Sequence, residues 1–206
     1  MSRFRGPKGK IVRRFGVNIY GNPKFDRLLS RRPNKPGVHG NFKGRRKISE
    51  YGKQLIEKQK IKYTYGLRER EFRVLFNRAL KANGITGDNL MILLETRLDS
   101  VLYRLTMAPS RDAARQLVLH GHVKVNGRRV NIPSFHISGG DEISVKDSVR
   151  SQALVRRYLE ENASRDVPDW LSVDRDNLKC KLERTPIREE LESVANEQLV
   201  VELFSK

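Results

Sequence analysis

The stretch from Arg97 to Arg128, RLDSVLYRLTMAPSRDAARQLVLHGHVKVNGR, decides the fold of this chain. Its apolar residues first recur every three to four positions, which is the period of an amphipathic helix. Beyond Gly121 the period changes to two, since Val123 and Val125 alternate with polar residues. Asn126-Gly127 is a strong signal for a tight hairpin turn. The stretch therefore predicts two helices joined by a tight turn and followed by an antiparallel hairpin.

Helices are also predicted on the N-terminal side of this stretch. Ser49 can cap a helix that ends near Gly66. The next helix, before Gly84, is the clearest in the chain because its apolar residues share one face. These residues are Phe72, Leu75, Phe76, Ala79 and Leu80. An apolar stripe over residues 90–105 indicates a further helical segment, either one helix or two helices with a break near Thr96.

On the C-terminal side, the pattern predicts strands and one helix. A strand is expected at residues 142–145, a helix around residues 148–162 and a second hairpin over residues 170–182. Cys180 lies with Leu178 and Leu182 on the inward face of that hairpin, so we interpret it as a core residue. The apolar run at residues 199–204 is expected to dock on the helices of the first half.

Charge indicates the class of partner. The chain has 42 Lys and Arg against 24 Asp and Glu, a formal net charge of +18. Residues 1–50 contain fifteen basic and two acidic side chains, whereas residues 151–206 contain nine and twelve. A protein with such a field attracts polyanions, of which nucleic acid is the commonest. The acidic end is expected to face solvent or a basic partner protein.

Several classes of protein are excluded. Cys180 is the one cysteine of the sequence, so neither an intrachain disulfide nor a cysteine zinc site is expected. No apolar run approaches the ~20 residues of a membrane span, and the N-terminus lacks the apolar core of a secretory signal. These features predict a reducing, cytosolic compartment.

The helix opened by Ser110 and the hairpin beyond it form the candidate RNA-binding surface. Arg111 and Arg115 are four residues apart and share one helical face. The polar side chains that follow are His120, His122 and Lys124 at the turn, and Asn126, Arg128 and Arg129 at the hairpin tip. Polar donors on one side of a rigid frame suit phosphate and 2′-hydroxyl contacts along structured RNA. An ordinary solvated face is the open alternative.

The expected fold class is α+β, with three parts. Residues 1–48 are rich in Gly, Pro, Arg and Lys without a regular apolar period, so we expect an extended basic arm with short helical pieces that orders against RNA. A disordered tail is the alternative. Residues 49–95 form a mainly helical domain on which residues 196–206 dock. Residues 96–195 form a second domain, and its helix-turn-helix and antiparallel-hairpin module covers about residues 97–158.

Residues 97–105, 110–118 and 120–128 resemble a widespread RNA-binding module, which is named after ribosomal protein four of the small subunit. That module also occurs in pseudouridine synthases and tyrosyl-tRNA synthetases. Five further segments resemble the bacterial and organellar ribosomal protein family itself, so the resemblance runs from end to end. They are residues 1–8 (MSRFRGPK), 36–40 (PGVHG), 51–60 (YGKQLIEKQK), 65–66 (YG) and 196–206 (NEQLVVELFSK). The chain departs from the zinc-binding version of the family because no cysteine lies in its first ~35 residues.

The resemblance implies a structural constituent of the small ribosomal subunit, without enzymatic activity, cofactor or metal. It implies a primary binder of the 5′ domain of 16S-type rRNA that nucleates assembly of the subunit body. The other implied partners are small-subunit ribosomal protein five, at an interface that influences translational accuracy, and mRNA. The implied location is the small subunit in the cytoplasm, with an organellar ribosome as the open alternative.

Candidate RNA-binding residues fall on every predicted part. They are Arg3, Arg5, Lys8, Lys10, Arg13, Arg14, Arg31, Arg32, His39, Lys53, Lys58, Lys60, Arg70, Arg104, Arg111, Arg115, Gln116, His120, His122, Lys124, Asn126, Arg128 and Arg129. By the resemblance, basic residues after the Pro-Gly-Val-His-Gly motif line the path by which mRNA enters the subunit. They are Lys43, Arg45, Arg46 and Lys47.

Other classes of function are weaker. Acidic pairs such as Asp141 and Glu142 are typical of caps and turns rather than of acid–base catalysis. His120 and His122 alternate at the start of a strand, so their side chains are expected to diverge, which disfavours a metal site. An RNA-modifying enzyme would need a further catalytic domain of roughly 150–200 residues. A free regulatory RNA-binder that represses translation or aids antitermination stays open.

Overall fold

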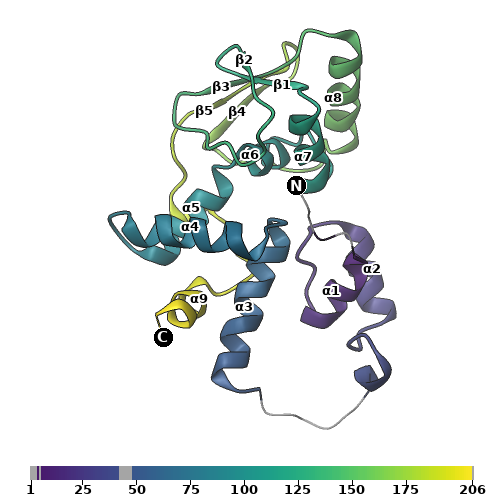
Figure 1. The fold of residues 1–206 in the computed structure, drawn as a ribbon. Helices are drawn as coiled ribbons and strands as arrows, with labels where there is room; N and C mark the ends of the chain where they lie inside the picture. The colour runs from purple at the N-terminus through teal and green to yellow at the C-terminus, as the bar shows by residue number, and fades with distance from the viewer. Residues whose placement is uncertain (1–3, 5, 42–47, 206) are drawn as a thin grey trace. The chain divides into compact units, whose positions relative to one another are not determined.

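The computed structural model describes residue 4, residues 6–41 and residues 48–205 (Figure 1). The chain divides into two units, one containing residues up to Gly87 and from Glu192 onward, the other residues Asp88–Leu191. The division falls within helix α5 (Thr86–Glu95). Both helices and strands are present, which confirms the α+β fold class. Within the described residues, no helix combines the length and apolar character needed to cross a membrane.

The first unit is helical wherever it has regular structure among its described residues. Its further helices are α1 (Lys8–Phe15), α2 (Pro23–Arg31), η1 (Val38–Asn41), α3 (Glu50–Thr64), α4 (Glu69–Lys81) and α9 (Glu197–Phe204). The predicted helix capped by Ser49 is α3, and the Ser49 hydroxyl accepts a hydrogen bond from the Gly52 amide at 3.2 Å. The predicted face of α4 is buried except for Leu80, which is 59% exposed. Leu80 lies at the solvent-facing edge of the apolar stripe, near the end of the helix.

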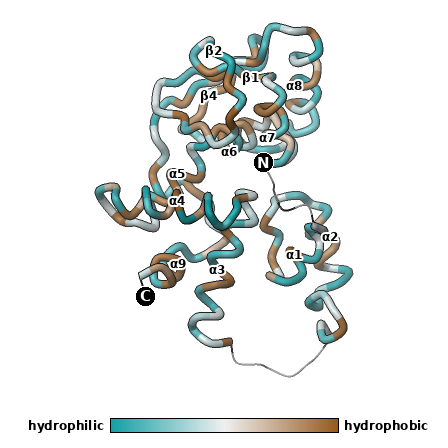
Figure 2. The backbone as a smooth tube through the Cα atoms, in the orientation of Figure 1, coloured by the Kyte–Doolittle hydropathy of each residue, from teal (hydrophilic) through white to brown (hydrophobic). Residues whose placement is uncertain are grey.

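Helix α9 completes the core of this unit. Hydrophobic residues run along much of its length (Figure 2), and it packs against α3. The Phe204 ring stacks on Phe76 and Phe72, with centroids 4.4 and 6.0 Å apart. The Gln54 side chain of α3 donates a hydrogen bond to Glu202 at 3.1 Å. Helix α9 therefore shares one core with α3 and α4, and this packing removes its apolar face from water.

Residues 8–31 belong to the predicted extended arm with short helical pieces, and they pack more closely than that prediction implied. Helices α1 and α2 pack against each other, and Val12 and Ile19 are buried. The Phe15 ring lies 6.1 Å from the Tyr63 ring of α3. Sequence periodicity missed this packing because each helix is only two to three turns long, which is too short to establish a period.

The second unit combines helices with one antiparallel sheet of strand order β2-β1-β3-β5-β4. The strands are β1 (Val123–Val125), β2 (Arg128–Arg129), β3 (Glu142–Val145), β4 (Leu171–Asp174) and β5 (Lys179–Leu182). The helices are α6 (Leu98–Arg104), α7 (Arg111–Leu119), α8 (Val149–Glu161) and η2 (Arg188–Glu190). The predicted break near Thr96 separates α5 from α6.

The two predicted hairpins join into this single sheet. Strand β3 pairs with β5, so that Ile143 lies opposite Cys180. Both side chains are buried, and burial raises the pKa of the Cys180 thiol to about 12. Cys180 is therefore a neutral core residue, as predicted. Leu178 is also buried, but it precedes β5 with φ +52° and is not part of the strand.

Candidate nucleic-acid interface

Backbone geometry fixes the turn between α7 and β1. The His122 amide donates to the Leu117 carbonyl at 3.0 Å. Gly121 has φ +70°, a left-handed conformation that favours glycine. The rings of His120 and His122 lie nearly parallel, with centroids 6.1 Å apart and an angle of 29°. The expectation that these side chains diverge is wrong, because Gly121 reverses the chain and the strand alternation starts only at Val123.

Arg129 lies over this turn. A β-carbon built on Gly121 would be 2.2–2.6 Å from atoms of the Arg129 guanidinium. Strand pairing sets Arg129 opposite Lys124. The hairpin between them turns at Asn126 and Gly127, with φ +49° and +75°, and a type I′ turn requires positive φ at both positions. The hairpin read from the sequence thus brings a guanidinium onto the end of α7.

More cations surround His122. Burial lowers the pKa of His122, and the nearby charges of His120, Arg150, Lys146 and Arg129 lower it further. The Lys146 amide also donates to the His122 carbonyl at 2.8 Å. We name this group the basic turn. Its members are His120, His122, Arg129, Lys146 and Arg150.

Lys146 and Arg150 are the members of the basic turn that sequence reasoning missed. Lys146 directly follows β3 and Arg150 lies in the first turn of α8, so both are far along the chain from α7. The pairing of β3 with β1 brings them to the turn, because Val145 lies opposite Val123. No local pattern in the sequence signals that proximity.

Two arginines of α7, Arg111 and Arg115, bind buried carboxylates instead of facing open solvent. Arg111 Nη2 lies 3.0 Å from Glu95 Oε1, and Arg115 Nη2 lies 2.9 Å from Asp99 Oδ2. The two carboxylate side chains are 0% and 3% exposed, and the two arginine side chains 15% and 13%. Buried carboxylates need such partners because an unpaired buried charge is strongly destabilising.

The same pairing extends to two more arginines. Arg104 Nη2 lies 2.9 Å from Glu95 Oε1, and Arg97 Nη2 lies 2.8 Å from Asp99 Oδ2. These four ion pairs link the end of α5 to α6 and α7. The sequence predicted Arg104, Arg111 and Arg115 as RNA ligands, whereas the structure gives each an internal partner. Direct RNA contact by these three stays a prediction.

The other predicted RNA-binding residues of the second unit are either exposed or bonded to side chains of the same unit. Gln116, Arg128 and Arg129 are exposed. Lys124 pairs with Asp147 at 2.5 Å. Asn126 donates to Asp141 at 2.8 Å and accepts from the Glu142 amide at 2.9 Å, so this side chain ties the hairpin to β3.

The predicted residues of the first unit also fall into groups. Lys10, Arg14, Arg31, Arg32, His39 and Arg70 are exposed. Lys8, Arg13, Lys53, Lys58 and Lys60 contact, in that order, the Tyr20 ring, the Asn34 carbonyl, Glu50, Glu69 and Glu57. Lys58 is only 8% exposed, so its contact is internal. Arg3, Arg5, Lys43, Arg45, Arg46 and Lys47 lie outside the described residues.

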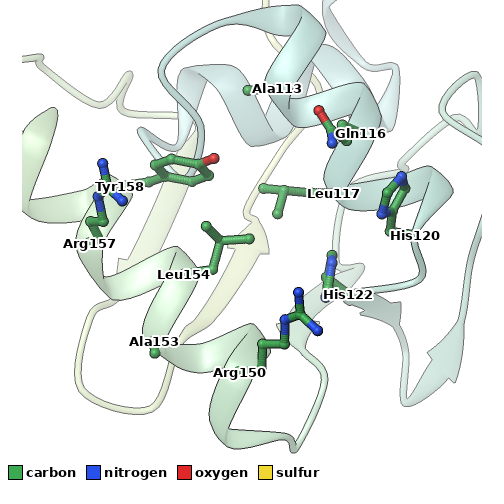
Figure 3. Close-up of a pocket in the computed structure, with 10 residues that line it drawn as sticks. All are labelled: Ala113, Gln116, Leu117, His120, His122, Arg150, Ala153, Leu154, Arg157 and Tyr158. Carbon is green, nitrogen blue, oxygen red and sulfur yellow. The ribbon is translucent and has the colours of Figure 1, made fainter.

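A groove opens between α7 and α8, next to the basic turn (Figure 3). It has a volume of about 680 Å³. The residues that line it are Ala113, Gln116, Leu117, His120, His122, Arg150, Ala153, Leu154, Arg157 and Tyr158. Neither the groove nor any other described part of the chain contains a group of three or more His, Cys, Asp or Glu that could hold a metal ion.

The hairpin module carries cations at its turn, and buried ion pairs hold its frame. This arrangement is typical of an RNA-binding protein. Comparison with known families agrees with that class. The Ribosomal protein S4/S9 N-terminal domain matches residues 3–95, and the S4 domain matches residues 96–143.

Relatives match over the whole chain. Small ribosomal subunit protein uS4 of Borrelia turicatae (strain 91E135) is 50% identical over 207 residues, covering 100% of this chain and 99% of its own. The protein of the same name from Opitutus terrae (strain DSM 11246 / JCM 15787 / PB90-1) is 50% identical over 206 residues, covering 100% of both. The chain belongs to the uS4 family of small-subunit ribosomal proteins.

Proposed function

We propose that this chain is a primary rRNA-binding protein of the small subunit, without catalytic activity, that contacts the 5′ domain of 16S-type rRNA. It binds where several RNA helices meet and helps to nucleate assembly of the subunit body. The observation that carries the proposal is the basic turn, where Lys146, Arg129 of β2 and Arg150 of α8 gather beside the two histidines that follow α7. Membership of the uS4 family supports it.

The mechanism is electrostatic and positional. Each phosphate that a cation neutralises releases counterions, so the affinity falls steeply with salt. With roughly 5–10 phosphate contacts the loss between 50 and 200 mM salt is on the order of 10³–10⁵-fold. Specificity comes from the fixed spacing of the cations against a folded junction, because the deep groove of A-form RNA hides the base edges.

Further contacts belong to the same proposal. Small-subunit ribosomal protein five is the proposed protein partner, at an interface that influences translational accuracy. Lys43, Arg45, Arg46 and Lys47 line the path of incoming mRNA. The protein acts in the cytoplasm as part of the small subunit. Substituting these four residues with Ala is expected to spare assembly and to slow translation through structured mRNA.

The salt dependence of rRNA binding tests the role of the basic turn. Arg129→Ala and Arg150→Ala should each lower the affinity for a transcript of the rRNA 5′ domain. Each should reduce the slope of log K against log salt by about 0.7–0.9, the contribution of one phosphate contact. Arg175→Ala, which removes an exposed arginine from the β4–β5 hairpin, is the matched control. Slopes unchanged in both test variants would remove the basic turn from the interface.

Sedimentation separates the ribosomal function from that of a free regulatory RNA-binder. In lysate, the protein should co-migrate with small subunits at near one copy each. A pool that stays with the soluble fraction instead would favour the regulatory function.

A further inference from the structure

The groove between α7 and α8 combines an apolar floor with a basic rim. Leu117 of α7 and Leu154 of α8 point toward each other across it, and the Tyr158 ring stands beside them (Figure 3). His120, His122 and Arg150 line the end next to the basic turn. The volume of about 680 Å³ falls within the ~300–1,000 Å³ typical of sites for small organic groups.

The charge of the groove restricts its occupant. None of the described residues that line it is acidic, whereas two are arginines and two are histidines. One of the arginines, Arg157, is paired with Glu161 at 2.8 Å at the rim. An occupant must therefore combine a flat or apolar part with negative charge next to it.

The histidine end of the groove is held in place. His122 Nδ1 lies 2.8 Å from the Ser151 hydroxyl, which lies 2.7 Å from the Ser148 hydroxyl. Ser148 caps α8 by accepting from the Ser151 amide at 3.3 Å. These bonds fix the His122 ring relative to α8. A ring that is already oriented loses little conformational entropy when a ligand binds.

We propose that this groove receives one unpaired base of the bound RNA. The base stacks against Tyr158 above Leu117 and Leu154, and Arg150 and His120 hold the adjoining phosphates. A nucleotide meets both requirements, since every base has an apolar face and a flanking phosphate, and proteins commonly read unpaired RNA by stacking on aromatic rings. The inference rests on the proposed RNA-binding function and adds a site for a single nucleotide.

Stacking and charge neutralisation respond differently to salt, which makes the site testable in the full-length chain. Tyr158→Ala should raise the Kd for the rRNA 5′-domain transcript by roughly 5- to 150-fold, the range for losing one stacked base. The slope of log K against log salt should stay at the wild-type value, because stacking releases no counterions. Tyr158→Phe, which keeps the ring, should bind as wild type does.

A second variant fills the groove without removing a packed ring. Ala153 is exposed on α8, so Ala153→Leu adds bulk at the mouth without disturbing the core. It should weaken binding at unchanged salt slope, and dimethyl sulfate should again modify an unpaired base that wild-type protein protects. Val149→Ala is the control on the same helix, because Val149 is 88% exposed and lies outside the groove.

The outcomes distinguish the site from the general function. Wild-type affinity in both Tyr158→Ala and Ala153→Leu would overturn the nucleotide site and leave rRNA binding intact. A changed salt slope in these variants would also overturn it, since the groove would then act through phosphates alone. Failure of the wild-type protein to prefer the 5′-domain transcript over arbitrary RNA would overturn the proposed function itself.

Discussion

The side chains around an arginine decide what it does in this protein. Arg115 and Arg128 are both basic residues of the RNA-binding module, yet the first pairs with buried Asp99 and the second is exposed on the hairpin. A guanidinium that already neutralises a buried carboxylate adds little to the field outside. An exposed one keeps its charge available to a phosphate.

Arg115→Ala is therefore expected to act on stability. It leaves Asp99 with Arg97 as its ion-pair partner, so the cost should lie near the lower end of the range for breaking buried pairs, about 3 kcal/mol. Denaturant unfolding measures this loss. Arg128→Ala, at an exposed position, should change the free energy of unfolding by less than about 0.5 kcal/mol. Equal small effects in the two variants would contradict the structural role of Arg115.

His122 of the basic turn predicts a pH dependence. Burial and neighbouring cations hold the pKa of His122 below its ordinary value of 6.5. In the window just below pH 6.5 the unfolded chain binds more protons, so the stability that neutral His122 contributes is present above pH 6.5 and lost as the pH falls.

Folding favours the neutral form of His122, whereas bound RNA favours the charged form, because phosphates stabilise the charged imidazole. We expect rRNA affinity to rise as the pH falls below about 6.5, with uptake of protons on binding. Calorimetric titration in buffers of different ionisation enthalpy measures that uptake, and His122→Gln should reduce it. Equal proton uptake in wild type and His122→Gln would exclude His122 from the linkage.

At the scale of elements, the α7–β1 turn depends on a residue without a side chain. Gly121 must adopt positive φ and also leave room for the Arg129 guanidinium. The sequence marked Gly121 as the end of a helix, and the close approach of Arg129 came only with the β1–β2 pairing. The end of α7, the β1–β2 hairpin and the position of Arg129 therefore all depend on Gly121.

Gly121→Ala should combine backbone strain with displacement of Arg129. We expect a loss of about 1–2 kcal/mol in unfolding free energy from the left-handed conformation, together with weaker rRNA binding. Gly140→Ala is the matched control, because Gly140 has φ +92° and no side chain or backbone within 4 Å of its added β-carbon. It should lose similar stability and keep wild-type affinity. Weakened binding in both variants would mean that strain alone is responsible.

At the scale of the whole molecule, the chain divides into two compact units. The ring contacts that the structure gives Phe204 lie in its own unit, on Phe72 and Phe76. Trp170 is the one tryptophan of the sequence and is buried in the other unit. Tryptophan fluorescence therefore reports on the second unit, while circular dichroism reports on helices of both.

Phe204→Ala should destabilise the first unit by about 2 kcal/mol, below the ~3–5 kcal/mol typical of fully buried phenylalanines because Phe204 is partly exposed. The circular dichroism transition should begin at lower denaturant while the Trp170 fluorescence midpoint stays in place. Val38→Ala, at a residue 95% exposed in the same unit, is the control. Parallel shifts of both signals would show that the two units unfold together.

The sequence by itself determined most of the local elements from residue 49 onward and the class of protein. The cap at Ser49, the break near Thr96 and the turn at Asn126-Gly127 depend on residues only a few positions apart, and net charge depends on composition alone. Only the tertiary structure decided which cations are available to RNA. It paired Arg111 and Arg115 with buried carboxylates and brought Lys146 and Arg150 to the turn. Ion pairing and burial depend on distance in space, which a linear pattern does not contain.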